Sequence, residues 1–486
     1  MITSVFLAFV AIATMFAFFN WRIGVGLWMV IAILQDPIRK ITPGNPVYLT
    51  VAFLPVYFAT FLSLLLSKNV IKAFAREYSP LARLFQTMIA MLLFSAVYGF
   101  TASHKSVMAS MIGIGSYVGG LPAILCGYAF LKKDYRFLDW LILGFVAATS
   151  IMLIGVPLEH FGYKFSRPWL GTFAATAGET RRWFNDFDYV EMISGFYRSP
   201  EIMGWHAMVL IICSFYLFLR RPSYAVIWTA LATWGCYGVF LSGRRKMLLM
   251  LFVFVGTFLT FSTLRNRKRI VKALVLTSTL MVPGMLFFVN DLYRMSLSSG
   301  VDTAGGKVAE KMMTGPIWLA TIVGPFGFGV GTLTQGAQHF RGAQNFTQSV
   351  YIPLVEGGME KVMVEVGLVG LSIVMLLGVQ LVIDSRRSLR LGQRFLPKEF
   401  GPGFCFSYIA ANASAFLIAF QFLGDPFIGT FLGLFIGMLL STNRIIKSQQ
   451  PKTVAAITTA YPNDSASLRL IATAGPATGF RQRNAD

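Results

Sequence analysis

Long apolar runs separated by short polar stretches make up most of the chain. A helix needs roughly 20 predominantly apolar residues to cross the hydrocarbon layer of a membrane. Runs close to that length lie near residues 1–19, 46–66, 82–101, 107–131, 137–156, 223–241, 271–290, 362–383, 403–422 and 425–442. Shorter runs, expected to be tilted, broken or buried against neighbours, lie near 23–35, 205–219 and 247–263. The pattern predicts an all-α, polytopic membrane protein with about 13 spanning helices.

The composition agrees with this pattern. Of the 486 residues, 55% are hydrophobic and only 13% are charged, and the mean hydropathy is +0.64. A chain of this composition would be insoluble as a globule, so lipid is its expected solvent. The formal net charge of +21 is spread between the apolar runs and is not gathered in one polar domain. This distribution argues against a nucleic-acid partner and indicates a membrane surface or an anionic substrate.

The cysteines indicate neither a disulfide framework nor a metal site. Cys126, Cys213, Cys236 and Cys405 each lie within an apolar run, without a CxxC pair or a histidine at metal-ligand spacing. No cofactor is expected. Residues 1–19 carry neither a basic n-region nor a small-residue cleavage site, so the first helix is expected to be retained.

Basic clusters give the expected orientation, because Lys and Arg concentrate in cytoplasmic loops. Five clusters fall on alternate loops and therefore on one side: Lys68/Lys72/Arg76/Arg83, Lys132/Lys133/Arg136, Arg220/Arg221, Arg265/Arg267/Lys268/Arg269 and Arg386/Arg387/Arg390/Arg394/Lys398. Residues 1–442 are predicted to form the membrane domain, and the polar segment 443–486 a disordered cytoplasmic tail. Two long loops on the opposite, periplasmic face, 157–204 and 291–361, form the candidate active region.

One basic group breaks this charge pattern. Arg244, Arg245 and Lys246 follow Ser242 and Gly243 on the periplasmic side, at the start of an apolar run. Charge placed against the orientation rule needs a reason. The side chains either extend to lipid headgroups or form an anion site, because guanidinium groups bind phosphate oxygens in pairs and keep their charge.

A second motif on this face, residues 195–206, surrounds Arg198 with small and turn-forming residues. Its structural interpretation is a turn before a helix, with Pro200 near the first helical position. Its functional interpretation is a substrate site that uses Arg198. For His206, near the expected helix start, a satisfied structural histidine is favoured over a catalytic one.

The second long loop ends in glycines and carboxylates. Residues 324–331 contain four glycines, which permit close backbone approach and positive φ. The segment lacks the Lys and Ser/Thr of a phosphate loop, so nucleotide binding is rejected. Glu356, Glu360 and Glu365 follow at the membrane boundary. For Glu360 and Glu365 the preferred interpretation is capping of a helix N-terminus, worth about 0.3–1 kcal/mol.

From about residue 190 to 375 the order of these motifs resembles the superfamily of O-antigen ligases and O-antigen or exopolysaccharide polymerases. In that family a glycine-to-proline turn precedes a helix, as in Gly195–Gly204, and a Ser-Arg pair opens a helix on the outer face, as in Ser242–Arg245. A Pro-x-x-Gly-x-Gly segment follows, here Pro325–Gly331. A Glu-x-Gly-x-x-Gly ending comes last, here Glu365–Gly370 with its spacing intact.

Two departures from the family pattern favour a polymerase, or another branch of the superfamily, over a ligase. Counting back from Glu365 places Glu356 where the ligases carry their functional histidine. Where the ligases carry a second arginine before the glycine segment, this chain has Lys311 or, farther off, Arg294.

The resemblance implies a glycosyltransferase-C-like fold in the bacterial inner membrane, multi-pass, with its active site on the periplasmic face. It implies an inverting glycosyltransferase that moves an oligosaccharide from a polyprenyl-pyrophosphate carrier to a sugar hydroxyl during exopolysaccharide or O-antigen biosynthesis. A flippase and a chain-length regulator of the same pathway are the implied partners besides the lipid bilayer. On this interpretation Glu356 is the catalytic base, and Arg244 and Arg245 stabilise the leaving pyrophosphate without a metal. The expected substrate-binding residues are Arg198, Lys246, Glu360, His206, Arg294 and Lys311.

Three alternatives remain. Ligase-type transfer to another acceptor uses the same chemistry. A lipid-linked glycan flippase or other transporter predicts ionisable residues near the centres of several helices, whereas Glu365 and Asp139 lie near the ends of theirs. A structural component of a secretion assembly has no positive feature in the sequence.

Overall fold

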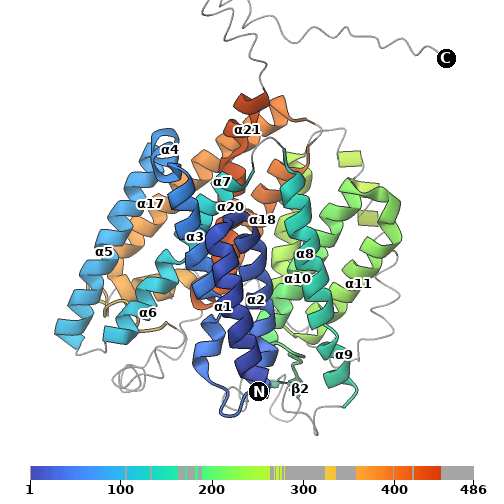
Figure 1. Ribbon diagram of the computed structural model, residues 1–486, viewed down its shortest axis with the longest axis horizontal. Helices are drawn as coiled ribbons and strands as arrows, with labels where there is room; N and C mark the ends of the chain where they lie inside the picture. The colour runs from blue at the N-terminus through green and yellow to red at the C-terminus, as the bar shows by residue number, and fades with distance from the viewer. Residues whose placement is uncertain are drawn as a thin grey trace, which may run out of the picture.

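The computed structural model describes most of the membrane-embedded chain. The described residues are 2–103, 107–131, 134–162, 170–171, 181–183, 189–262, 267–268, 270–272, 274–275, 279, 323–334, 357–397, 399–418 and 421–449. Nearly all of them are helical (Figure 1). The strands of the described part are β1 (Arg181–Trp183) and β2 (Tyr189–Glu191), an antiparallel pair with Arg182 opposite Val190.

The helices follow one another with short connections, as expected for a polytopic protein. The first half contains α1 (Ile2–Phe19), α2 (Trp21–Ile41), η1 (Val47–Val51), α3 (Leu54–Ser67), α4 (Val70–Glu77), α5 (Ser79–Ser103), α6 (Val107–Val118), α7 (Gly120–Phe130), α8 (Arg136–Met152) and α9 (Gly155–His160). The second half contains α10 (Pro200–Arg220), η4 (Pro222–Tyr224), α11 (Ala225–Leu241), α12 (Arg245–Phe261), α17 (Gly358–Phe395), α18 (Gly401–Ile418), α19 (Gln421–Gly424), α20 (Pro426–Leu440) and α21 (Thr442–Gln449).

The chain is a multi-pass membrane protein by the length and apolarity of its helices. Within the described residues, 10 helical segments are long and apolar enough to cross a membrane, and α12 is a shorter apolar helix. The run predicted at 271–290 lies mostly outside the described residues, so the count of 13 stays a prediction. The runs near 23–35 and 205–219 were expected to be short, but α2 and α10 each contain 21 residues. Hydropathy underestimated the lengths of both helices, because polar residues at their ends form ion pairs or hydrogen bonds with other parts of the protein.

Two predicted runs are interrupted at glycine. The run 107–131 forms two helices, α6 and α7, that meet at Gly119. Helix α7 packs closely on α20: a Cβ on Gly127 would lie 2.1 Å from the carbonyl oxygen of Leu434. Small residues allow helix backbones to approach in this way in membranes. Helix α17 contains 38 residues and is interrupted at Gly367, where φ is +68°.

Figure 1 shows how the helices are arranged. Helices α5, α6 and α17 lie on one side, α8, α10 and α11 on the other, and α1, α2, α3, α7 and α20 between them. Helix α10 is the most enclosed, because 94% of its most apolar stretch is buried. We call the end with α9, β2 and the start of α10 the Arg198 end, and the end with α4 and α21 the Arg220 end.

The described members of the five basic clusters share the Arg220 end, as the alternation of loops predicted. The start of α12 and the start of α17 lie at the Arg198 end. Which end faces the cytoplasm stays a prediction.

The predicted tail begins too early. Helix α21 continues beyond residue 443, and Ile445 and Ile446 in it are buried. Asn443 donates a hydrogen bond to the carboxylate of Glu77, the last residue of α4. Two consecutive apolar side chains, Ile445 and Ile446, are the part of this polar stretch that the protein buries. Residues 450–486 lie outside the described residues.

Candidate functional site

The loop that precedes α10, residues 192–199, is held by buried charges; we call it the Arg198 loop. The Arg198 guanidinium lies between two carboxylates, that of Asp36 near the end of α2 at 3.1 Å and that of Asp425 at the start of α20. The side chain of Arg198 is 13% exposed, and each aspartate is 4% exposed. Charges buried to this extent require partners.

Backbone N–H groups also hold the carboxylates of Asp36 and Asp425 in position. Asp36 accepts a hydrogen bond from the backbone N–H of Arg198 at 3.2 Å. Asp425 is the N-cap of α20 and accepts the N–H groups of Phe427 and Ile428 at 2.8 and 3.1 Å. Burial alone would lower the pKa of the Arg198 guanidinium, but Asp425 and Asp36 outweigh burial and raise it. Arg198 therefore stays charged and joins α2, α20 and the loop.

A second set of buried charges holds the other side of the Arg198 loop. Lys40, which is 4% exposed, donates hydrogen bonds to the carbonyl oxygens of Gly195, at 2.9 Å, and Tyr197. Glu159 in α9 accepts the N–H groups of Ser194 and Gly195 at 3.1 and 2.6 Å. Gly195 has a φ of +58°, which favours glycine.

The turn with the unexpected basic residues packs against this loop. The N–H of Ile193 donates to the carbonyl of Leu241 at 3.0 Å. A Cβ on Gly204 would lie 2.7 Å from Oγ of Ser242, so only glycine fits there without movement. Lys246 forms an ion pair with Glu201 in the first turn of α10. The motifs at 195–206 and 242–246 therefore form one unit.

Arg244 is the N-cap residue of α12 and is half-buried. Arg245 is the first residue of that helix. Three consecutive cations, Arg244 to Lys246, thus occupy the positive end of a helix dipole. That placement is unfavourable unless an anion or a carboxylate lies near, and Glu201 supplies one carboxylate.

The glycine segment, residues 323–334, lies against the interruption in α17. The N–H of Phe328 donates to the carbonyl of Val364 at 2.8 Å, and the N–H of Val369 donates to the carbonyl of Pro325 at 3.2 Å. A Cβ on Gly367 would lie 2.2 Å from that same carbonyl oxygen of Pro325. Glycine at 367 therefore permits both the positive φ and the backbone contact.

Glu365 binds the glycine segment through hydrogen bonds. The prediction that it caps the N-terminus of a helix is therefore wrong. Its side chain is fully buried within α17 and accepts hydrogen bonds from the Tyr117 hydroxyl at 2.8 Å, the Leu333 N–H at 2.9 Å and the Thr334 hydroxyl at 2.9 Å. The sequence motif predicted a boundary position. The interruption at Gly367 instead lets the loop cover this part of the helix.

Glu360 does cap α17, because its carboxylate accepts the N–H of Gly357 at 3.1 Å. The neighbouring Lys361 is fully buried, and its ammonium donates to the carbonyl of Leu423 at 3.4 Å. Leu423 is two residues before Asp425, the partner of Arg198. The segment 423–425 therefore contacts both the start of α17, through Lys361, and the Arg198 loop, through Asp425.

His206 lies in an aromatic box under the Arg198 loop. Its ring stacks on Phe145 and Phe427, with centroids 6.1 and 5.5 Å apart, and contacts Tyr197 at 4.6 Å. Its Nδ1 is 2.9 Å from the carbonyl oxygen of Ile202, one turn earlier. These contacts agree with the structural interpretation, and substrate binding by His206 stays a prediction.

The remaining predicted site residues are not described by the structure, and several residues that the structure places at this end were not predicted. Glu356, Arg294 and Lys311 lie outside the described residues. Sequence reasoning missed Asp36, Lys40, Glu159 and Asp425, and also Tyr117. Both aspartates precede a proline within or beside an apolar run, which is the signal that was available.

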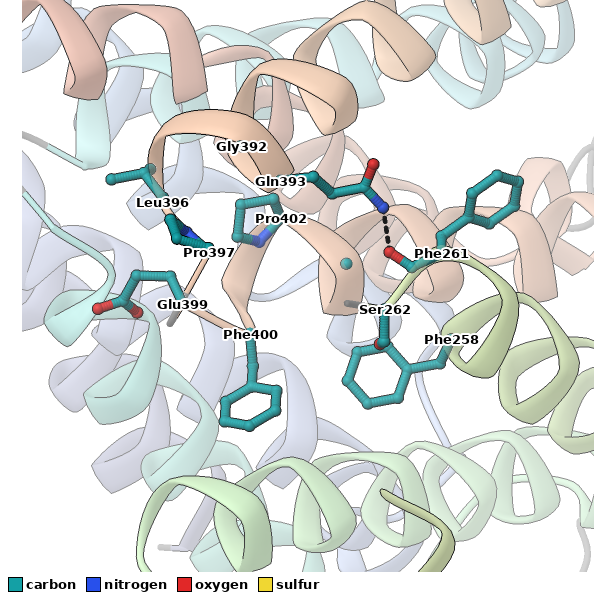
Figure 2. A pocket seen from close by; sticks show the side chains of 11 residues that line it. Phe258, Phe261, Ser262, Gly392, Gln393, Leu396, Pro397, Glu399, Phe400 and Pro402 are labelled. Carbon is teal, nitrogen blue, oxygen red and sulfur yellow. Dashed lines mark hydrogen bonds between the residues drawn. The ribbon is translucent and has the colours of Figure 1, made fainter. Parts of the chain in front are cut away.

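Figure 2 shows a pocket far from this site. It lies at the Arg220 end between α12, α17 and the start of α18, where the Gln393 amide donates to the carbonyl of Phe261. Glu399 lines it and forms an ion pair with Arg220 at 3.0 Å. Burial raises the pKa of Glu399, and Arg220 opposes that rise. The pocket does not belong to the motifs at the Arg198 end.

Within the described ranges, no three His, Cys, Asp or Glu side chains are grouped closely enough to hold a metal ion. Anion binding by Arg244, Arg245 and Lys246 stays a prediction.

The comparisons with known proteins give no family: no family model matches the chain, and no curated protein matches it in sequence.

Proposed function

We propose that the chain is a bacterial inner-membrane glycan polymerase that transfers an oligosaccharide from a polyprenyl-pyrophosphate carrier to a sugar hydroxyl. One observation carries the proposal. The motif pairs that resemble the O-antigen polymerase and ligase superfamily, 195–206 with 242–246 and 323–334 with 365–370, are in contact within each pair. Both pairs lie at the end opposite the basic clusters.

The chemistry follows from charge. The acceptor oxygen attacks the anomeric carbon, the bond from that carbon to the pyrophosphate oxygen breaks, and the acceptor proton passes to a base. In the proposal Glu356 takes the proton, and Arg244 and Arg245 stabilise the charge that gathers on the pyrophosphate. The concentration of cations at the start of α12 supports this role, since an anion there gains from the helix dipole as well.

The distribution of buried charge favours an enzyme over a transporter. Of the buried charged residues in the described part of the chain, Asp36, Lys40, Glu159, Lys361 and Asp425 belong to the Arg198 end, and Asp139 and Asp384 belong to the Arg220 end. Glu365 lies within α17 and is hydrogen-bonded to the glycine segment and to Tyr117. In the second turn of α10, His206 and Trp205 pack against the rings of Phe145 and Phe431, and nearer its end Tyr216 packs against Phe404. A transport path needs ionisable or polar residues through the centre of the bundle.

The test is Glu356→Gln with Glu360→Gln as the matched control. If Glu356 is the base, its amide variant should lose about 10²–10⁴-fold in polymer synthesis. Lipid-linked repeat units should then accumulate while the amount of protein in the membrane stays normal. If Glu360 acts only as the cap of α17, Glu360→Gln should keep near-normal synthesis, because an amide oxygen can still accept the Gly357 N–H. A loss of synthesis with normal protein levels in Glu360→Gln would instead support the substrate-binding role expected from the sequence. Near-normal synthesis by Glu356→Gln would remove this residue from the mechanism.

A further inference from the structure

Three cations gather around an aromatic platform at the Arg220 end, far from the candidate site. The guanidinium of Arg22, at the start of α2, lies over the ring of Trp21 at 4.7 Å and over that of Phe137 at 5.7 Å. The ammonium of Lys68 lies over the same Trp21 ring at 5.7 Å. Arg444 in α21 is close enough to interact with Arg22 as a like charge.

The guanidinium of Arg22 has donors that the protein does not use. Its Nε and Nη2 atoms are buried, and no acceptor among the described residues forms a hydrogen bond with either. A buried, charged donor without an acceptor is costly, so an acceptor from outside the chain is expected there. The cation–π contacts with Trp21 and Phe137 hold the guanidinium plane in place but satisfy neither N–H group.

The carboxylate of Glu77, on the Arg444 side of this cluster, is hydrogen-bonded to other side chains. Glu77 beside α21 accepts hydrogen bonds from the Tyr128 hydroxyl and from the Asn443 amide, one on each oxygen. Arg444 lies over the Tyr128 ring at 5.7 Å and donates to the Tyr128 carbonyl at 3.5 Å. Both oxygens of Glu77 thus have other donors, and Glu77 does not supply the acceptor that the Arg22 guanidinium lacks.

The surroundings of the cluster are apolar and exposed. Phe19 is 80% exposed, Leu66 is 70% exposed and Phe137 is 42% exposed. These side chains stand next to Asn20–Arg22, Lys68 and the Arg22 guanidinium respectively. An anion bound here therefore has apolar surface beside it that suits acyl chains.

We infer that Arg22, Lys68 and Arg444 bind the phosphate group of an anionic membrane phospholipid, with its acyl chains on the exposed apolar side chains beside them. The paired N–H groups of a guanidinium match two phosphate oxygens. A zwitterionic headgroup would bring an ammonium group next to three cations, so a headgroup without an amine, such as phosphatidylglycerol, is favoured. Basic pockets between membrane helices bind anionic headgroups in this way.

The test measures lipid binding and not glycan transfer, so it stands apart from the proposed function. The purified full chain, in detergent, is titrated with phosphatidylglycerol, phosphatidylcholine or inorganic phosphate, and thermal stability and lipid retention in native mass spectra are recorded. Phosphatidylglycerol should raise the melting temperature and remain bound. Phosphatidylcholine and inorganic phosphate should have little effect. An equal response to inorganic phosphate, or to phosphatidylcholine, would overturn the assignment to an anionic lipid.

Variants locate the site. If each cation contributes about fivefold to affinity, Arg22→Gln with Lys68→Gln should weaken phosphatidylglycerol binding about 25-fold. Arg221→Gln is the control, because Arg221 also lies over a tryptophan ring, that of Trp140 at 5.6 Å, at the same end. It should bind like the unchanged protein. Arg444→Gln gives a second reading if the double variant is poorly folded. Unchanged binding by folded Arg22 or Arg444 variants, or equal weakening by Arg221→Gln, would refute the site.

Discussion

Replacing Arg198 by glutamine tests whether this residue holds the loop or binds substrate. Arg198→Gln leaves Asp36 and Asp425 buried, each with a side chain only 4% exposed. Removing one partner from a buried ion pair costs about 3–5 kcal/mol. Asp36 keeps the backbone N–H of residue 198, and Asp425 keeps two N–H groups of α20. We therefore expect a loss at the lower end, about 3 kcal/mol of unfolding free energy.

The assay is unfolding in mixed micelles, titrated with a denaturing detergent and followed by circular dichroism. Asp425→Asn keeps an N-cap oxygen for α20 and removes the charge, so it completes a double-mutant cycle with Arg198→Gln. The double variant should cost less than the sum of the single variants by about 1–3 kcal/mol. Arg136→Gln is the exposed control, since its side chain is 82% exposed, and it should cost about 0–1 kcal/mol.

Two results would refute this reasoning. Strictly additive losses would mean that Arg198 and Asp425 do not stabilise one another. Unchanged stability of Arg198→Gln together with lost glycan transfer would assign Arg198 to the substrate, as the sequence motif predicted.

Further predictions concern the glycine segment, a titrating carboxylate and the C-terminal helix. Gly367→Ala should cost about 1–3 kcal/mol, because its Cβ would meet a carbonyl of the glycine segment, whereas Gly378→Ala in the same helix has open space and should be neutral or stabilising. Both are measured by the same titration. Burial raises the folded-state pKa of Glu399 above its ordinary 4.5, so its contribution to stability is complete below pH 4.5 and is lost as pH rises through the folded pKa. Stability measured against pH should change less in Glu399→Gln, and an unaltered profile would contradict the assignment. Ending the chain after Gln449 should leave thermal stability unchanged, while ending it after Ser441 removes two buried isoleucines and should cost roughly 3 kcal/mol.

The sequence predicted the helical membrane fold because hydropathy is a local property. It failed on the length of α2, because Asp36 and Lys40 are polar although other elements pair with them. It failed on the length of α10 for the same reason, because Glu201 and Arg220 at its ends are paired with Lys246 and Asp139. It also failed on Glu365, whose hydrogen-bond partners include Tyr117, 248 residues away in the chain. Partners at such separations leave no periodic signal in a single sequence.

For the candidate site, too, local sequence features were predicted and partners distant in the chain were not. The motifs around Arg198, Arg244 and Gly367 were found from residue type and spacing, since glycine, proline and misplaced arginine are visible locally. The carboxylates that position the Arg198 loop, Asp36, Glu159 and Asp425, were not found. Asp425 looks like an ordinary N-cap before a proline, and nothing near it in the chain indicates that its second oxygen faces Arg198.

The pairing of Arg198 also orders the assembly of the protein in the membrane. A ribosome makes Arg198 long before Asp425, which follows 227 residues later. Before α20 has been synthesised and inserted, Asp425 is missing, and Asp36 is the one of the two aspartates that can pair with Arg198. At that stage the ion pair joins the Arg198 loop to α2 and not yet to α20. Insertion of α20 therefore adds the Asp425 carboxylate as the second partner of Arg198, in a loop near the middle of the chain. A nascent chain that stops before residue 425 keeps an arginine short of one carboxylate at the membrane boundary, a chemical difference by which unfinished copies are distinguishable from finished ones.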